Sequence, residues 1–341
     1  MINNYIEKVA SGINLTVDEA YESMTHIMNG SCNNSQIAGF LLALKTKGET
    51  PEEVAGFVKA MRNKSIKINS DENVIDVCGT GGDGSNTFNI STAAAFVVAG
   101  CGVKVAKHGN KSISSKCGSA DVLSHLGINI NLSPSAAEEA LNKIGITFLF
   151  APLYHPAMKH AAEVRKELGM RTVFNILGPL TNPANTKKQL IGTFNNQAAE
   201  LMSKAASYLD MQKVCFVCTE NSLDEISLTE KTDVFEHNKS SLRKYQISHE
   251  TFGYKKVDKK NIQSSSVEKN AEMILSVLRD KVKNDAFYVV SANAAMALYA
   301  ADFSNDLNEC RLAAEESILS GKAYEKLLSL KSFGENYQWI F

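Results

Sequence analysis

Residues 1–65 place apolar side chains at the spacing of short amphipathic helices. Thr16 and Glu19 form a capping-box pattern that begins one helix, and Gly30 is suited to end it. An apolar stripe over residues 36–47 predicts the next helix, which stops at Gly48, and the Thr-Pro-Glu-Glu run that follows has the features of a further helix start. Helices this short cannot bury themselves singly. The pattern therefore predicts helices that pack together or against a partner chain.

From Val74 the pattern changes to short apolar runs that alternate with helical segments. The runs predicted to be buried strands are 74–78, 103–107, 147–150, 189–194, 214–217 and 286–290. The segments predicted to be helices are 90–99, 134–144, 198–209 and about 268–282. Alternation of strand and helix predicts an α/β domain with its ligand site at the carboxyl ends of the strands.

One segment combines glycines, hydroxyls and lysines without any acid. The run GTGGDG at 79–84 directly follows the first predicted strand, and residues 85–117 contain no aspartate or glutamate. The basic side chains there are Lys104, Lys107, His108, Lys111 and Lys116. Flexible backbone N–H donors, small hydroxyls and lysines are groups that hold phosphate, so this segment predicts a phosphate site.

The same glycines invite a second interpretation. Gly79, Gly81 and Gly84 match the dinucleotide fingerprint between a strand and a helix. A nicotinamide or flavin site also needs an acid at the end of the second strand, to bind the ribose hydroxyls. Here that strand ends in Lys-His-Gly-Asn, and no acid follows for more than ten residues. The pattern argues against an oxidoreductase and leaves phosphate binding.

Two further pairs of residues are candidate sites for metal ions. The adjacent acids Asp224 and Glu225 lie between apolar residues, and they are either surface residues or ligands for Mg²⁺, which prefers carboxylates together with substrate phosphate oxygens. Spacing alone does not decide between these. Cys215 and Cys218 have zinc-like spacing, but no second pair exists and their strand is apolar, which favours buried thiols.

Composition narrows the possible partners. The 341 residues carry a net charge of -1, which gives no general attraction to nucleic acid or anionic lipid. No apolar run reaches the ~20 residues of a membrane span, and the first residues lack the features of a signal peptide. Seven scattered cysteines suit a reducing compartment. We expect a soluble cytoplasmic protein.

Several long motifs, in order, resemble the anthranilate phosphoribosyltransferase family. They are GTGGDGSNTFNIST at 79–92, KHGN at 107–110, SSKCGSADVL at 114–123, HPAMKHAAEVRKELGMRTVFNILGPLTNP at 155–183 and LDEISL at 223–228. The amino-terminal AGFLLALKTKGETPEEVAGFVKAMR is similar as well, so the resemblance spans about Leu15 to Lys322. One departure is Lys111, where the family usually has arginine. Lysine keeps the charge and loses the planar two-pronged contact.

The resemblance implies a fold, a reaction and partners. The fold is a small all-helical domain, at 1–68 with a further contribution from about 165–185, plus a larger α/β domain at 69–341 that binds phosphoribosyl pyrophosphate. The reaction is transfer of phosphoribosyl to the amine of anthranilate in tryptophan biosynthesis, with Mg²⁺ as cofactor. The partners are these two small molecules and a second copy of the chain, mainly through the helical domain. Neither nucleic acid nor a membrane is implied.

The resemblance also assigns site residues. Phosphoribosyl pyrophosphate binding is assigned to Gly79, Gly82, Asp83, Thr87, Asn89, Ile90, Ser91, Thr92, Lys107, His108, Gly109, Asn110, Lys111, Ser112, Ile113, Ser114, Ser115 and Ser119. Anthranilate binding is assigned to Gly79, Asn110 and Arg165, and magnesium binding to Ser91, Asp224 and Glu225. The further pocket neighbours are His108, His155 and Gly178. By pattern alone Arg165 is a surface residue, and only the resemblance gives it a role.

Two other functions use the same architecture. A pyrimidine nucleoside phosphorylase shares the glycine-rich loop, but it needs a single phosphate site and no paired-acid metal site, so Asp224 and Glu225 argue against it. A nonenzymatic nucleic-acid-binding relative needs a basic face and has lost the substrate residues. The net charge and the presence of the KHGN motif and Arg165 argue against that function.

Overall fold

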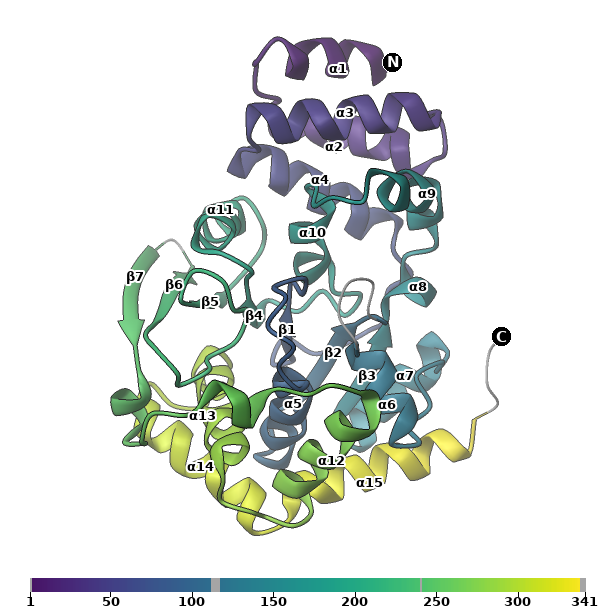
Figure 1. Cartoon of the computed structure of the whole chain (residues 1–341). Helices are drawn as coiled ribbons and strands as arrows, with labels where there is room; N and C mark the ends of the chain where they lie inside the picture. The colour runs from purple at the N-terminus through teal and green to yellow at the C-terminus, as the bar shows by residue number, and fades with distance from the viewer. Residues whose placement is uncertain (1, 112–116, 240, 338–341) are drawn as a thin grey trace.

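The computed structural model describes residues 2–111, 117–239 and 241–337. Its amino-terminal part is a bundle of four helices, which Figure 1 shows at one end of the molecule, away from the sheet. The four are α1 (Ile2–Ala10), α2 (Val17–Met28), α3 (Asn34–Lys47) and α4 (Pro51–Lys64). Together with the α/β part described below, the bundle confirms the predicted fold class.

The helix starts of this bundle are set by local sequence. The Thr16 hydroxyl accepts from the Glu19 N–H at 3.2 Å, and the Thr16 N–H donates to the Glu19 carboxylate at 2.8 Å. The same reciprocal pair begins α4, and a further one, which the sequence analysis did not identify, begins α3. Gly48 ends α3 with φ of +87°, a conformation that glycine adopts without steric cost. The predicted starts and stops are therefore confirmed.

The larger part of the chain contains one seven-stranded sheet in the order β3-β2-β1-β4-β5-β6-β7. The strands are β1 (Ile75–Gly79), β2 (Val105–Gly109), β3 (Ile146–Phe150), β4 (Lys188–Gly192), β5 (Lys213–Thr219), β6 (Thr232–Asn238) and β7 (Ser241–Ile247). Strands β1 to β5 run parallel, and β6 and β7 are antiparallel additions at one edge. The parallel strands confirm the predicted α/β domain.

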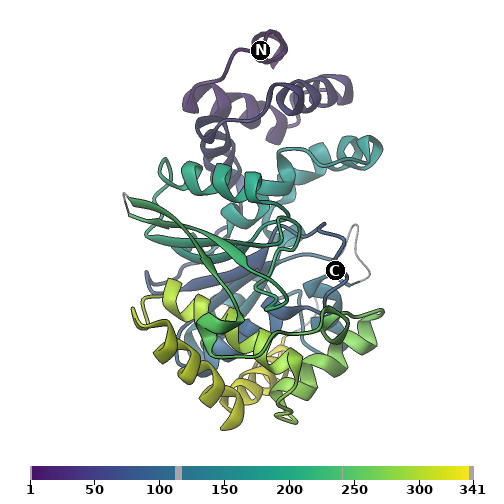
Figure 2. The same ribbon diagram turned by 60° about the vertical axis from the view of Figure 1, so that its left-hand side comes forward.

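Helices cover both faces of the sheet, and Figure 2 shows the two layers with the sheet between them. One face is covered by α5 (Ile90–Gly100) and α13 (Asp285–Ala300), the other by α11 (Asn196–Ala206), which also contacts α4. The remaining helices are α6 (Ser119–His125), α7 (Pro134–Lys143), α8 (Ala151–Tyr154), α9 (Lys159–Leu168), α10 (Phe174–Leu177), α12 (Val267–Leu278), α14 (Leu307–Leu319) and α15 (Lys322–Glu335). The short 3₁₀ helices are η1 (Pro156–Met158), η2 (Gly178–Thr181), η3 (His249–Phe252) and η4 (Lys259–Ile262).

Alternate residues of the strands enter two different cores. On β5, Cys215 and Val217 face the core that contains α5 and α13, while Val214 and Phe216 join the core of the helical bundle. The bundle core reaches the sheet through α9, α10 and α11. The two parts are thus joined by continuous apolar packing. Among the described residues, no helix combines the length and apolar composition needed to cross a lipid bilayer.

One predicted element is wrong. Residues 286–290 form no strand and instead lie in the first two turns of α13. The Asn284 side chain caps this helix by accepting from the Phe287 N–H at 3.1 Å. A five-residue apolar run has no period that separates a buried strand from a helix buried on all sides. Helix α13 is of the second kind, since 13 of its 16 residues are buried.

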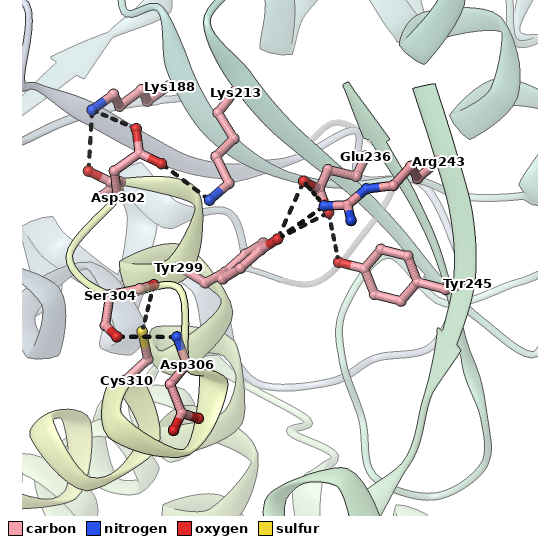
Figure 3. Close-up of polar contacts among 11 residues, drawn as sticks. Lys188, Lys213, Glu236, Arg243, Tyr245, Tyr299, Asp302, Ser304, Asp306 and Cys310 are labelled. Carbon is pink, nitrogen blue, oxygen red and sulfur yellow. Dashed lines mark hydrogen bonds and ion pairs between the residues drawn. The ribbon is translucent and has the colours of Figure 1, made fainter. Parts of the chain in front are cut away.

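A polar network joins the amino ends of β4 and β5 to the end of α13 (Figure 3). The Asp302 carboxylate pairs with Lys188 at 2.9 Å and with Lys213 at 3.1 Å, and both lysines are buried. The Lys213 ammonium also lies 3.6 Å from the centre of the Tyr299 ring, whose hydroxyl donates to Glu236 at 3.2 Å. These contacts lie at the amino ends of the strands, and the glycine-rich run lies at the opposite, carboxyl ends. We therefore assign the network to the stability of the fold rather than to the ligand site.

We expect Asp302→Ala to lower the free energy of unfolding by about 2 kcal/mol, because it leaves two buried lysines without a counter-charge. The loss stays below the roughly 3–5 kcal/mol of a fully buried pair, since the Asp302 side chain is 48% exposed. The control is Asp210→Ala, which removes the surface pair with Lys187 and is expected to cost less than about 1 kcal/mol. Denaturant unfolding measures both, and equal losses would contradict the role of Asp302.

Candidate active site

The order of the strands predicts a ligand crevice at the carboxyl ends of β1 and β4. The chain adds β2 and β3 on one side of β1, then returns to place β4 and β5 on the other side. Neighbouring strands whose connections diverge in this way leave a crevice where ligands of open α/β sheets bind. The run GTGGDG begins at Gly79, the last residue of β1, and therefore enters this crevice.

The conformation of the glycine loop is fixed by its own backbone and by an acid from a distant segment. Gly81, Gly82 and Gly84 have φ values of +66°, +71° and +72°, which a residue with a Cβ adopts only at a cost. The Gly81 N–H donates to the Asp224 carboxylate at 2.7 Å, across 143 residues of sequence. The Asp83 carboxylate accepts from the Ser85 N–H at 3.1 Å and from the Asp224 N–H at 3.4 Å.

Glycines of β1 and β4 seat the segment that carries Asp224. A Cβ added at Gly192 would lie 1.6 Å from the Asp224 carbonyl oxygen, and one added at Gly79 would lie 2.6 Å from its carboxylate. The backbone at 224 therefore occupies the space that a side chain at the end of β4 would fill. Asp224 is buried and Glu225 half-buried, so neither is an exposed surface acid, and their role as metal ligands stays a prediction.

Glu225 lies against the amino terminus of α5. Its carboxylate accepts from the Ser91 N–H at 3.1 Å, in the first turn of the helix, where the helix dipole favours negative charge. Burial, followed by the neighbouring Asp224, raises the pKa of Glu225 well above its usual range. Burial, with Asp83 beside it, raises the pKa of Asp224 to about 7. The crevice therefore contains acids whose negative charges are not fully stabilised by the groups around them.

This donor set fits a magnesium ion. Two adjacent carboxylates, the buried Asp224 and the half-buried Glu225, lie near a serine hydroxyl and supply the oxygen ligands that Mg²⁺ takes from proteins, with its remaining positions left for water and phosphate oxygens. Among the described residues no three His, Cys, Asp or Glu side chains form a closed metal cluster. The roles of Ser91, Asp224 and Glu225 as ligands stay predictions.

Lys107 brings a positive charge into the same crevice from β2. Its ammonium donates to the Val77 carbonyl at 2.6 Å and lies 3.4 Å from the Ser91 hydroxyl. Beneath it, the buried Asp76 accepts from the His108 N–H at 3.1 Å and from the Asn182 amide at 2.8 Å. Sequence analysis missed Asp76 and Asn182, because they are joined only by a contact over 106 residues.

The predicted phosphate residues after the glycine loop are supported by a segment far along the chain. The Asn270 side chain accepts from both the N–H of Asn89, at 2.7 Å, and its amide, at 3.0 Å. The Asn89 side chain does not cap α5, and the Glu225 carboxylate instead accepts a hydrogen bond from the first turn of this helix. Gln263 pairs with Thr87 in a β-bridge. Asn270 and Gln263 had no signal in the sequence, because neither lies in a motif.

The other predicted phosphate residues have varied surroundings. Ile90 and Thr92 are buried, so Ile90 can offer a ligand only its backbone, while the Thr92 hydroxyl has no partner among the described residues. Gly109 lies against Ser119, whose hydroxyl would be 2.3 Å from an added Cβ. The Lys111 ammonium lies 5.9 Å from the centre of the Phe150 ring. The predicted residues Ser112, Ile113, Ser114 and Ser115 lie outside the described residues.

Two histidines form a buried pair beside the crevice. The rings of His108 and His155 are 5.1 Å apart, and neither Nε2 atom has a hydrogen-bond partner among the described residues. Burial, with His155 nearby, lowers the pKa of His108 well below its usual range, and burial lowers that of His155 to about 4. Both rings are therefore neutral at pH 7, which suits an uncharged wall rather than an anion site.

Arg165 lies on α9 with its guanidinium half-buried. It stacks over the Phe174 ring at 5.1 Å and pairs with no carboxylate in the described part of the chain. Burial lowers the pKa of Arg165, yet a guanidinium stays charged at neutral pH. A half-buried cation without a counter-ion is a candidate for an anionic ligand. Asn110, another of the three predicted anthranilate residues, is exposed after β2, and its carbonyl accepts from the Ala120 N–H at 3.2 Å.

Comparison with known proteins gives a consistent result. Residues 71–324 match the α/β domain of a glycosyl transferase family, and residues 3–65 match the helical bundle domain of the same family. Anthranilate phosphoribosyltransferase from Geobacillus kaustophilus is 47% identical over 332 residues, which cover 97% of this chain and 98% of the relative. The Petrotoga mobilis enzyme of that name is 47% identical over 337 residues, covering 98% and 97%.

Solved structures give the same family. Anthranilate phosphoribosyltransferase from Thermus thermophilus aligns with a TM-score of 0.91 and 37% identity, over 97% of this chain and 99% of that one. The Saccharomyces cerevisiae enzyme, solved in complex with PRPP and Mg, aligns with a TM-score of 0.89 and 28% identity over 98% of each chain. The chain belongs to the anthranilate phosphoribosyltransferase family.

Proposed function

We propose that the chain transfers the phosphoribosyl group of 5-phosphoribosyl 1-pyrophosphate to the amine of anthranilate, giving N-(5-phosphoribosyl)anthranilate and pyrophosphate, in tryptophan biosynthesis. The observation that carries the proposal is the meeting of the glycine loop, Lys107 and the pair Asp224 and Glu225 in one crevice. Relatives with this activity in their names share nearly the whole chain, and Saccharomyces cerevisiae structures contain PRPP with Mg, or 4-fluoroanthranilate.

The roles of the residues follow from the charges that the reaction develops. Breaking the anomeric bond leaves positive charge on the ribose and negative charge on pyrophosphate. The N–H groups of the glycine loop, the amino terminus of α5 and Lys107 would bind the pyrophosphate, and these donors become more favourable as its charge grows. Mg²⁺, bound by Asp224, Glu225 and Ser91, would supply further charge neutralisation.

On the acceptor side, Arg165 would bind the carboxylate of anthranilate and fix its position. The aryl amine is a neutral nucleophile, so its orientation matters more than its activation. Asn110 and Gly79 would complete this site, with the neutral pair His108 and His155 beside it. The geometry requires no covalent intermediate.

The proposal is tested by the fluorescence of anthranilate. Purified protein, phosphoribosyl pyrophosphate and Mg²⁺ together should make the fluorescence fall, while omission of any one should leave it unchanged. No fall with a folded protein that binds phosphoribosyl pyrophosphate would retain the phosphate site and discard anthranilate as acceptor. Phosphorolysis of a pyrimidine nucleoside in the same preparation would favour the nucleoside phosphorylase instead.

We also propose that the chain is a homodimer through its helical part, with the domain division at residues 68 and 69 and a contribution from 165–185. Support comes from apolar side chains that the bundle leaves exposed, among them Ile13 at 53% and Leu42 at 39%. We place the dimer in the cytoplasm, because all seven cysteines are free thiols.

Leu42→Glu is expected to convert the dimer to a monomer, because a charge on an apolar interface must be desolvated without a partner. Light scattering after size-exclusion chromatography measures the mass. The matched control is Leu328→Glu on α15, which replaces a similarly exposed leucine (43%) far from the bundle and should leave the mass unchanged. A wild-type monomer, or an unchanged Leu42→Glu dimer, would contradict this interface.

A further inference from the structure

Arg171 connects the glycine loop to the segment that carries Arg165. Its guanidinium Nη2 donates to the Gly82 carbonyl oxygen at 2.6 Å, and its Cζ atom lies 4.4 Å from the centre of the Phe194 ring. The Phe194 N–H in turn donates to the Thr80 hydroxyl at 3.1 Å. Arg171 therefore contacts the loop directly at Gly82 and indirectly at Thr80. Its side chain is exposed, and the sequence analysis assigns it no role.

The other contacts of the loop come from elsewhere. In the part of the chain that the structure describes, every other hydrogen bond of residues 80–86 is formed within residues 80–87 or with residues at 192–194, 224 and 263–264. All of those segments belong to the α/β part. Arg171 alone among these partners comes from the connection between α9 and α10, which packs against the helical bundle.

The backbone that follows Arg171 is anchored, so the position of Arg171 depends on that of the segment after it. Val173 and Phe174 are buried in the core shared with the helical bundle, and the Thr172 N–H donates to the Asn175 side chain at 3.0 Å. Arg165 lies six residues earlier and stacks on the same Phe174. Arg165 thus contacts Phe174 directly, while Arg171, three residues before Phe174 in the chain, contacts the glycine loop.

We propose that Arg171 is a positioning residue that couples occupancy of the glycine loop to the placement of Arg165. An anion held by the loop fixes Gly82, the Arg171 contact then fixes the α9–α10 connection, and Arg165 is held in its binding position before the second ligand arrives. The inference rests on the proposed function for the identity of the two ligands. Its thermodynamic form is reciprocal: each ligand raises the affinity for the other by the same factor.

The coupling can be measured without turnover, with magnesium pyrophosphate in the loop and anthranilate as the second ligand. Fluorescence titration of wild-type protein should show anthranilate binding roughly tenfold tighter when magnesium pyrophosphate is present. Arg171→Met, which removes the donor and the charge, should reduce that factor to within about twofold of one. Phe194→Leu removes the stacking partner from the other side and should reduce it as well.

Lys166→Met is the matched control, because it removes an exposed positive charge from α9 that has no contact with the loop. It should keep the wild-type coupling factor. A wild-type factor of one, an unchanged factor in Arg171→Met, or an equal loss in Lys166→Met would each overturn the inference. Turnover by the wild-type protein tests the proposed function separately, since the titration contains no phosphoribosyl pyrophosphate.

Discussion

Replacing Asp224 by Asn together with Glu225 by Gln is expected to raise the Mg²⁺ concentration for half-maximal activity more than about 100-fold. Substituting groups that merely orient metal ligands already costs roughly 10–100-fold in metal affinity, and this variant removes two carboxylate ligands themselves. Amides keep the shape and the capacity to accept the Gly81 and Ser91 N–H bonds. The double variant therefore loses negative charge at the site but keeps the local hydrogen bonds. Activity against Mg²⁺ concentration measures the effect.

The control for this variant is Glu220→Gln, which removes an exposed acid four residues before Asp224 and should leave the Mg²⁺ dependence unchanged. A second readout does not depend on activity. Burial raises the pKa of both Asp224 and Glu225, so their ionised forms destabilise the metal-free protein. In the absence of Mg²⁺, the double variant should have a Tm no lower than that of the wild type. An unchanged metal dependence would remove the proposed magnesium site.

Local signals in the sequence predicted the helical bundle well, because each helix start depends on residues three apart. Thr16 and Glu19 illustrate this, and their reciprocal bonds form in the structure as the pattern predicts. Residues 286–290 show the limit of such signals. Their apolar run is the same for a buried strand and a buried helix, and the Asn284 cap that distinguishes the two was not recognised.

The candidate site was predicted where its residues form motifs and missed where they act through distant contacts. The glycine loop and the acid pair are both visible in the sequence, but their junction at Gly81 and Asp224 is made only by the strand order. Arg171 and Asn270 contact the loop region across 89 and 181 residues. Neither has a local pattern that separates it from an ordinary surface arginine or helix asparagine, so only the fold identifies them.

Arg165→Ala should raise the KM for anthranilate by roughly 10–100-fold and leave the affinity for phosphoribosyl pyrophosphate, measured without anthranilate, within about twofold of the wild type. A charge-assisted pair with a carboxylate contributes about 1.5–3 kcal/mol, and each 1.4 kcal/mol is about tenfold in affinity. The guanidinium packs on Phe174 and has no carboxylate partner in the described chain, so its loss leaves no acid unpaired. Stability should therefore change little, and the effect should appear in binding.

Two variants make the interpretation of this result specific. Arg165→Lys keeps the charge but loses the planar fork, and should recover only part of the anthranilate affinity. Lys166→Ala removes a neighbouring exposed charge and should match the wild type for both substrates. Steady-state kinetics for anthranilate and a binding titration of phosphoribosyl pyrophosphate without anthranilate separate the cases. An equal loss for both substrates would show that Arg165 supports the whole crevice, because a residue bound to the acceptor's carboxylate must discriminate between the two substrates.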